Sequence, residues 1–190
     1  MVPGLVITEG QAEALAAARI SPELLEHCRG VGLYAAELAR RWGAGADEAM
    51  LGGLLHDYCR EMTGPQILQR CRDLGMPVSE LERRRPVQLL HARLAAAELS
   101  SLDLSADCLD AIARHTVGGA GMTVLARCLY VADTAEPGRT YKGAAELRAL
   151  AAESLEGALQ ASVARTLQHL VARGRPIHPD TIALYNELTG

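Results

Sequence analysis

The sequence predicts an all-α protein that folds as a single-domain helical bundle. Its 190 residues fit one domain, because domains usually contain about 100–200 residues. Apolar residues make up 49% of the chain, which is enough for a sizeable core. These residues recur at spacings of three and four, and the strict alternation typical of a half-buried strand is almost absent. We therefore expect helices throughout and no β-strand.

Capping residues, prolines and glycines predict where the helices begin and end. Ser21-Pro22 starts a long amphipathic helix, and Gly43 ends it. The other helices are expected from a cap at Asp47 to Leu55, after Pro65 to about Gly75, over 87–100, over 106–115 behind a cap at Ser105, from Thr123 to Asp133, over 143–152, over 154–173, and from about 179 onward. The charged segment 79–86 is expected to be broken by Pro86. Residues 1–20 are expected to form an N-terminal extension or short helix, and 21–190 the functional domain.

The composition argues against several classes of partner. A net charge of −4 gives no general attraction to nucleic acid, and the 3% aromatic content with no phenylalanine offers no platform for stacking bases. No apolar run reaches the roughly 18 residues that a membrane helix needs. The N-terminus does not resemble a signal peptide, and the five cysteines form no C-x-x-C pair. We therefore expect no macromolecular nucleic acid and no membrane as partners, and a cytoplasmic protein with buried, reduced thiols.

Histidines and aspartates lie within apolar helices, where such residues need a partner. Asp57 follows one of the most apolar stretches of the chain, and burying an unpaired carboxylate costs several kcal/mol. Helical bundles often hold a metal between histidines and carboxylates of neighbouring helices. A single histidine on an apolar face is usually a core residue, so the interpretation depends on the whole set and its order. The candidate ligands are His27, His56, Asp57, His91, His115 and Asp133.

These ligand types suit iron, manganese, cobalt or zinc and do not choose sharply among them. If Asp57 bridges, the set is large enough for two metal ions, which could activate a hydroxide and stabilise a phosphate oxygen. Arg139, displayed by a Pro-Gly turn, and Arg60 are candidates for neutralising polyphosphate charge, although each could equally be an ordinary exposed arginine. Thr116 and the glycine-rich link 118–121 could contact a phosphate or nucleoside, or form a plain loop. Weaker candidates for supporting groups around the metals are Tyr58, Glu61 and Glu136.

The order His…His-Asp…His…His…Asp on helices resembles the HD-domain phosphohydrolase superfamily, and in particular its bacterial YqeK-type symmetrical dinucleoside tetraphosphate hydrolases. The resemblance extends over about residues 21–190. The segments that carry it are His27-Cys28-Arg29-Gly30-Val31, Leu54-Leu55-His56-Asp57-Tyr58, Leu89-Leu90-His91, Arg114-His115-Thr116, Tyr130-Val131-Ala132-Asp133, Glu136-Pro137-Gly138-Arg139 and Ile177-His178-Pro179-Asp180-Thr181.

The resemblance implies an HD-type bundle with two metal ions, iron foremost, and symmetrical cleavage of diadenosine tetraphosphate to two ADP. One metal would bind His27, His56, Asp57 and Asp133, and the other Asp57, His91 and His115. The expected catalytic residues are His56, Asp57 and Arg60, and the expected substrate contacts are Arg60, His91, Thr116 and Arg139. Arg60 departs from the family, which often has lysine there, so a planar fork replaces an ammonium group.

Two other functions remain open at this stage. One is a different HD-type nucleotide phosphohydrolase or phosphodiesterase, although the chain lacks the Gly-Tyr-Pro extension expected of a cyclic-dinucleotide enzyme. The other is a helical module that binds nucleotide without turnover. The expected partner in each case is a small nucleotide, above all a dinucleoside polyphosphate. A homodimer is also left open.

Overall fold

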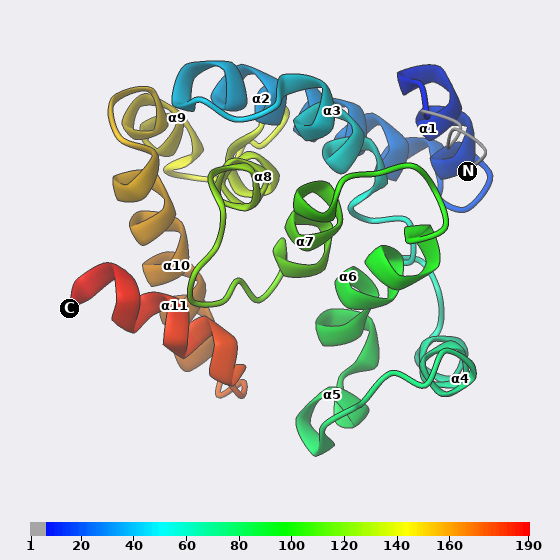
Figure 1. Cartoon of the computed structure of the whole chain (residues 1–190). Coiled ribbons are helices and arrows are strands. Elements are labelled where there is room, and N and C mark those ends of the chain that lie inside the picture. Colours follow the sequence, from blue (N-terminus) through cyan, green and yellow to red (C-terminus); the bar gives the residue numbers. More distant parts are fainter. Residues whose placement is uncertain (1–6) are drawn as a thin grey trace.

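The computed structural model describes residues 7–190, and this part of the chain is helical without a strand (Figure 1), which confirms the predicted fold class. No helix among these residues is both long and apolar enough to cross a membrane. The helices are α1 (Glu9–Ala17), α2 (Pro22–Trp42), α3 (Ala46–Leu55), α4 (Gly64–Asp73), α5 (Glu80–Arg84), α6 (Pro86–Leu99), α7 (Ala106–Arg114), α8 (Val124–Ala135), α9 (Ala144–Glu153), α10 (Leu155–Ala172) and α11 (Pro179–Thr189).

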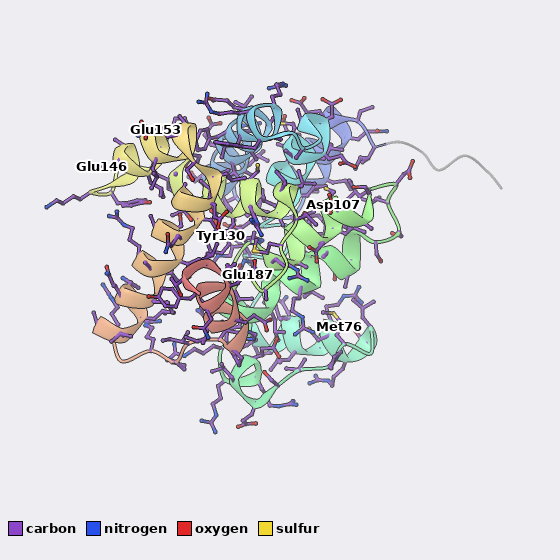
Figure 2. The ribbon with its side chains drawn as sticks, turned by 60° about the vertical axis from the view of Figure 1, so that its left-hand side comes forward. Met76, Asp107, Tyr130, Glu146, Glu153 and Glu187 are labelled. Carbon is purple, nitrogen blue, oxygen red and sulfur yellow. The ribbon has the colours of Figure 1, made fainter. Side chains whose placement is uncertain are left out.

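Helix α8 lies in the middle of the bundle. Figure 1 shows it end-on, and it packs against α2, α3, α7, α9 and α10. Its residues are almost all apolar or small, so it can be surrounded on every side. In Figure 2 the labelled Tyr130 of α8 lies inside the molecule, whereas Glu146 and Glu153 of α9 project at the edge. This central position allows a side chain of α8 to meet side chains from several other helices.

Helices α2 and α3 approach each other more closely than side chains normally permit. A Cβ atom added at Gly53 would lie 2.3 Å from the Cα atom of Gly32. The two backbones therefore touch at this pair of glycines, where no larger residue fits. Because His27 lies on α2 and His56 directly follows α3, this contact fixes how the two histidines face each other.

Two details of the predicted boundaries differ in the structure. The cap of α3 is Gly45, which offers no side-chain hydrogen bond, and not Asp47, which lies in the first turn. The segment 79–86 contains a helix that was not predicted, because Ser79 and Glu82 form a capping box that starts α5. The predicted break at Pro86 is confirmed, because α5 ends at Arg84 and Pro86 begins α6 at the first helical position, where proline is well tolerated.

The N-terminal region packs onto the bundle through α1. Thr8 and Gln11 form a capping box at its start, and α1 packs against α3. Ile7 and Ala12 belong to the main apolar core. Of the predicted extension over 1–20, residues 1–6 lie outside the described part of the chain. The predicted boundary at residue 21 stays a prediction.

Candidate metal centre

The six predicted ligands come from five helices and meet in one place. Their donor atoms form three overlapping groups, and within each group the atoms lie within 4.8 Å of one another. His27 lies on α2, His91 on α6 and Asp133 on α8, whereas His56 and His115 cap the C-termini of α3 and α7. A helix C-terminus favours positive charge, which adds to the attraction for a cation. The groups are His27, His56 and Asp57; His56, His115 and Asp133; and Asp57, His91 and His115.

Three of the histidines are oriented by their own helices. In each, Nδ1 lies within hydrogen-bond distance of a backbone carbonyl, at 2.7 Å for His56 and Gly53, 2.7 Å for His91 and Val87, and 2.8 Å for His115 and Ile112. A carbonyl oxygen can only accept, so Nδ1 must carry the proton. A neutral imidazole then has its lone pair on Nε2. The Nε2 atoms of all three rings therefore face the shared centre as potential ligands.

The Asp57 carboxylate lies between two sets of imidazoles. Its Oδ1 atom lies 3.1 Å from Nε2 of His91 and 3.5 Å from Nε2 of His115, while Oδ2 lies 3.6 Å from Nε2 of His56. The two oxygens thus face different histidines, which is the arrangement that a bridging ligand requires. Asp133 faces the side of His56, with Oδ1 3.1 Å from Nε2 of His27 and 3.8 Å from Nε2 of His56.

The surroundings keep both carboxylates ionised. Burial alone would raise the pKa of Asp57, but the imidazoles of His56, His115 and His91 outweigh it and lower the pKa well below its usual range. The pKa of Asp133 is lowered in the same way against burial, chiefly by the hydrogen bond from His27 and the nearby charge of His56. Both carboxylates can therefore act as anionic ligands in a largely buried place.

The donor set fits a metal ion. The Nε2 atom of His56 is buried and has no hydrogen-bond partner among the described residues, although a buried polar atom without one is rare in folded proteins. Nε2 of His91 lies only 3.1 Å from Nε2 of His115, so two lone pairs would face each other unless a cation or a proton lay between them. Imidazole nitrogens combined with carboxylate oxygens suit iron, manganese, cobalt and zinc. The cluster can thus hold metal, and its residues do not single out one element.

The predicted phosphate-binding residues lie around this centre, and their contacts in the structure differ. The Arg139 side chain does not project freely from its turn: Nη2 lies 2.9 Å from Oδ1 of Asp133 and 3.2 Å from Nε2 of His27. The Thr116 hydroxyl lies 3.2 Å from Nε2 of His91 and 3.0 Å from Nε2 of His115. Arg60 is half-buried, and among residues 7–190 its guanidinium group forms no hydrogen bond or ion pair. Its charge helps to lower the pKa of His91, an effect that adds to burial.

The three weaker candidates for supporting groups have different surroundings in the structure. Glu136 contacts the site, because its Oε1 atom lies 3.2 Å from Nδ1 of His27. Glu61 instead accepts hydrogen bonds from the backbone and hydroxyl of Ser21, and Tyr58 lies under the guanidinium group of Arg19. No local pattern favours Glu136 over the other two candidates, because 109 residues separate it from His27.

Comparison with known proteins agrees with this geometry. Residues 24–138 match the HD domain family, a stretch that contains all six candidate ligands and ends just before Arg139. The symmetrical bis(5'-nucleosyl)-tetraphosphatase of Bacillus subtilis strain 168 is 35% identical over 85% of this chain and 87% of its own length. The protein of the same name from Halalkalibacterium halodurans is 30% identical over 96% of this chain and 97% of its own.

A solved structure supports the same assignment. It is the crystal structure of a "predicted HD superfamily hydrolase involved in NAD metabolism" from Clostridium acetobutylicum, which is similar to this chain with a TM-score of 0.92 and 29% sequence identity. The likeness covers 97% of this chain and 98% of that one. Because the family match covers more than half of the chain and both enzyme relatives are at least 30% identical over most of it, this protein belongs to the HD domain family.

Proposed function

We propose that this protein is a metal-dependent hydrolase that cleaves dinucleoside tetraphosphates symmetrically, with two ADP as the products from diadenosine tetraphosphate. The observation that carries this proposal is the convergence of four imidazoles and two carboxylates, with donor atoms in groups no wider than 4.8 Å. Two relatives that bear the name of this activity support the substrate class, and the matches cover 87% and 97% of their lengths.

The metal ligands would divide into two sets that share Asp57. His27, His56, Asp57 and Asp133 would hold one ion, and Asp57, His91 and His115 the other. When bound, the ions supply Lewis acidity, which makes water a better nucleophile and stabilises charge on a phosphoryl oxygen. We propose iron for both positions, with manganese, cobalt and zinc as the alternatives that the same donor atoms accept.

The residues of the chain hold the metals and grip the substrate. The hydrogen bonds from Nδ1 of His56, His91 and His115 to backbone carbonyls keep each Nε2 aimed inward, so no reorientation is needed when substrate binds. Within the described part of the chain Arg60 has no acidic partner, and its guanidinium group is therefore available to bind polyphosphate oxygens in a bidentate manner. We assign this role to Arg60 in the catalytic machinery.

Three more residues would contact the phosphates at the rim of the centre. The Thr116 hydroxyl can donate to a phosphate oxygen next to His91, which lies 3.2 Å away. Arg139 can exchange its contact with Asp133 for a phosphate once a metal ion neutralises that carboxylate. The substrate contacts would thus come from Arg60 together with Thr116, His91 and Arg139.

We propose the cytoplasm as the compartment. All five cysteines are buried and unpaired, as expected for a protein in a reducing environment. The proposed partner is a small dinucleoside polyphosphate and not a macromolecular nucleic acid or a membrane. Sedimentation at several protein concentrations would decide whether the chain forms the homodimer left open by the sequence.

Product analysis tests the activity directly. Protein purified without added metal is analysed for its elements and then incubated with diadenosine tetraphosphate, and the products are separated by anion-exchange chromatography. We expect about two metal ions per chain and ADP as the sole nucleotide product. AMP together with ATP would contradict symmetrical cleavage. Faster hydrolysis of another nucleotide would favour a different HD activity, and the absence of both metal and turnover would favour a binding module.

The substitution Asp57→Ala tests the bridging role. We expect it to abolish metal occupancy and hydrolysis while the helical circular dichroism spectrum is retained, because both metal positions lose a ligand. Asp47→Ala is a matched control, since Asp47 is exposed in the first turn of the preceding helix α3. If Asp57→Ala hydrolysed the substrate at the parent rate, the bridging role would be refuted.

A further inference from the structure

His27 is the one candidate ligand histidine whose second nitrogen is not held by a carbonyl of its own helix. Its Nδ1 atom instead faces the carboxylate of Glu136, the residue that caps the C-terminus of α8, at 3.2 Å. Asp133, three residues earlier on α8, lies 3.1 Å from Nε2 of the same ring. One short segment at the end of α8 thus holds both nitrogens of an imidazole that belongs to α2.

We propose that Glu136 is a positioning residue of the metal centre. Its Oε1 atom accepts the Nδ1 proton of His27, which leaves the Nε2 lone pair directed at the metal position beside Asp133. This inference rests on the proposed metal-dependent function and extends it to a residue that does not itself touch the metal or the substrate. Carboxylates that orient a ligand histidine also make its donor nitrogen more basic, and their loss typically weakens metal binding about 10- to 100-fold.

The fold builds a close-fitting place for this carboxylate. Only 7% of the Glu136 side chain is exposed. Its Oε2 atom accepts a hydrogen bond of 2.5 Å from the backbone N–H of Gly138, so that Oε1 is left for His27. The backbone carbonyl of Glu136 accepts from the N–H of Arg139 at 2.8 Å and closes the turn. Both carboxylate oxygens and the backbone are therefore fixed.

Glycine is needed on the two sides of this carboxylate. A Cβ atom at Gly30 of α2 would lie 2.8 Å from Oε2 of Glu136, and one at Gly138 would lie 2.9 Å from the same oxygen. Both distances are shorter than real Cβ contacts, so an alanine at either position would push the carboxylate away. The two glycines therefore leave the space that the Glu136 carboxylate occupies beside His27.

The variant Glu136→Gln separates positioning from simple packing. It keeps the size of the side chain, but the amide has one acceptor oxygen for two donors, the Nδ1 proton of His27 and the N–H of Gly138. We expect titration of the metal-free protein with Co²⁺ to show one binding step weakened about 10- to 100-fold and the other unchanged. Long-range ¹H–¹⁵N spectra of the protein loaded with diamagnetic Zn²⁺ should show the His27 Nδ1–H resonance shifted in the variant, because an amide oxygen accepts this proton more weakly than a carboxylate.

Gly30→Ala is the second variant, and it carries the test if Glu136→Gln does not fold. It leaves Glu136 and His27 unchanged and should weaken the same Co²⁺ step by displacing the carboxylate. Glu37→Gln is the matched control, because Glu37 is an exposed carboxylate on the same helix and should leave both steps at their parent values. Parent-like Co²⁺ affinity and an unchanged His27 Nδ1–H resonance in the folded test variant would overturn the inference.

Failure of the positioning role of Glu136 can be distinguished from failure of the proposed function. If the parent protein binds Co²⁺ and responds to these variants but does not cleave diadenosine tetraphosphate, the proposed substrate is wrong and the positioning role stands. If the parent protein cleaves the substrate and the variants leave the metal affinity and the His27 Nδ1–H resonance unchanged, the positioning role alone is wrong.

Discussion

Replacing Gly53 by alanine perturbs the closest contact between two helices that carry the metal centre. The new Cβ atom would lie 2.3 Å from Cα and 2.4 Å from the backbone nitrogen of Gly32. Carbon atoms normally approach to about 3.5–4.0 Å. The obstacle is helix backbone and cannot rotate away as a side chain can, so α2 and α3 must move apart.

Two opposing effects set the size of the change in stability. Alanine is favoured over glycine in a helix by about 1 kcal/mol. Overpacking a well-filled interior usually costs about 1–3 kcal/mol, and a clash with backbone belongs at or above the top of this range. We therefore expect Gly53→Ala to lower the free energy of unfolding by about 2 kcal/mol. For a domain of this size that loss corresponds to a fall in Tm of about 4–8 °C.

The neighbouring glycine supplies a matched control. A Cβ atom at Gly52 would lie 3.6 Å from both Sγ of Cys108 and Cδ2 of Leu129, which is an ordinary contact. Gly52→Ala should therefore keep or slightly raise the free energy of unfolding, measured with urea for both variants. Gly53→Ala should also weaken Co²⁺ binding, because His27 belongs to α2 and His56 caps α3, the two helices that the substitution forces apart. Equal stability of the two variants would refute this reasoning.

Three further predictions concern the substrate, the metal and the thiols. Arg60→Ala should lower kcat/KM at least about tenfold at unchanged metal content, because a hydrogen bond to a charged group contributes about 1.5–3 kcal/mol; Arg60→Lys should retain part of the activity, and parent kinetics in both variants would exclude phosphate binding. Chelation should lower Tm reversibly, since the metal neutralises buried carboxylates; a Tm that does not respond to chelator or to added metal would contradict this. Burial raises the pKa of Cys59, Cys108 and Cys128 to about 12, so these thiols stay protonated at pH 8. Iodoacetamide should then modify them only after denaturation, and mass spectrometry that finds them modified in the folded protein would refute it.

The helices themselves are largely determined by local sequence. Ser21, Ser105 and Thr123 each accept a hydrogen bond from the backbone N–H three residues later, so the helix starts that they mark are confirmed. The short helix α5 was missed although its capping box, Ser79 and Glu82, is visible in the sequence. Local capping signals act over three or four residues, which is why one sequence is enough to find most of them.

The order of the six candidate ligands was also available from the sequence, since histidines and aspartates within apolar helices need partners. Which partners they have was not. The contact between His27 and Glu136 joins residues 109 positions apart, and the pairing of Arg139 with Asp133 depends on how the turn after α8 folds back. These contacts depend on the distances between the helices. Those distances are set by long-range packing, such as the touching backbones at Gly32 and Gly53, and no local pattern encodes them.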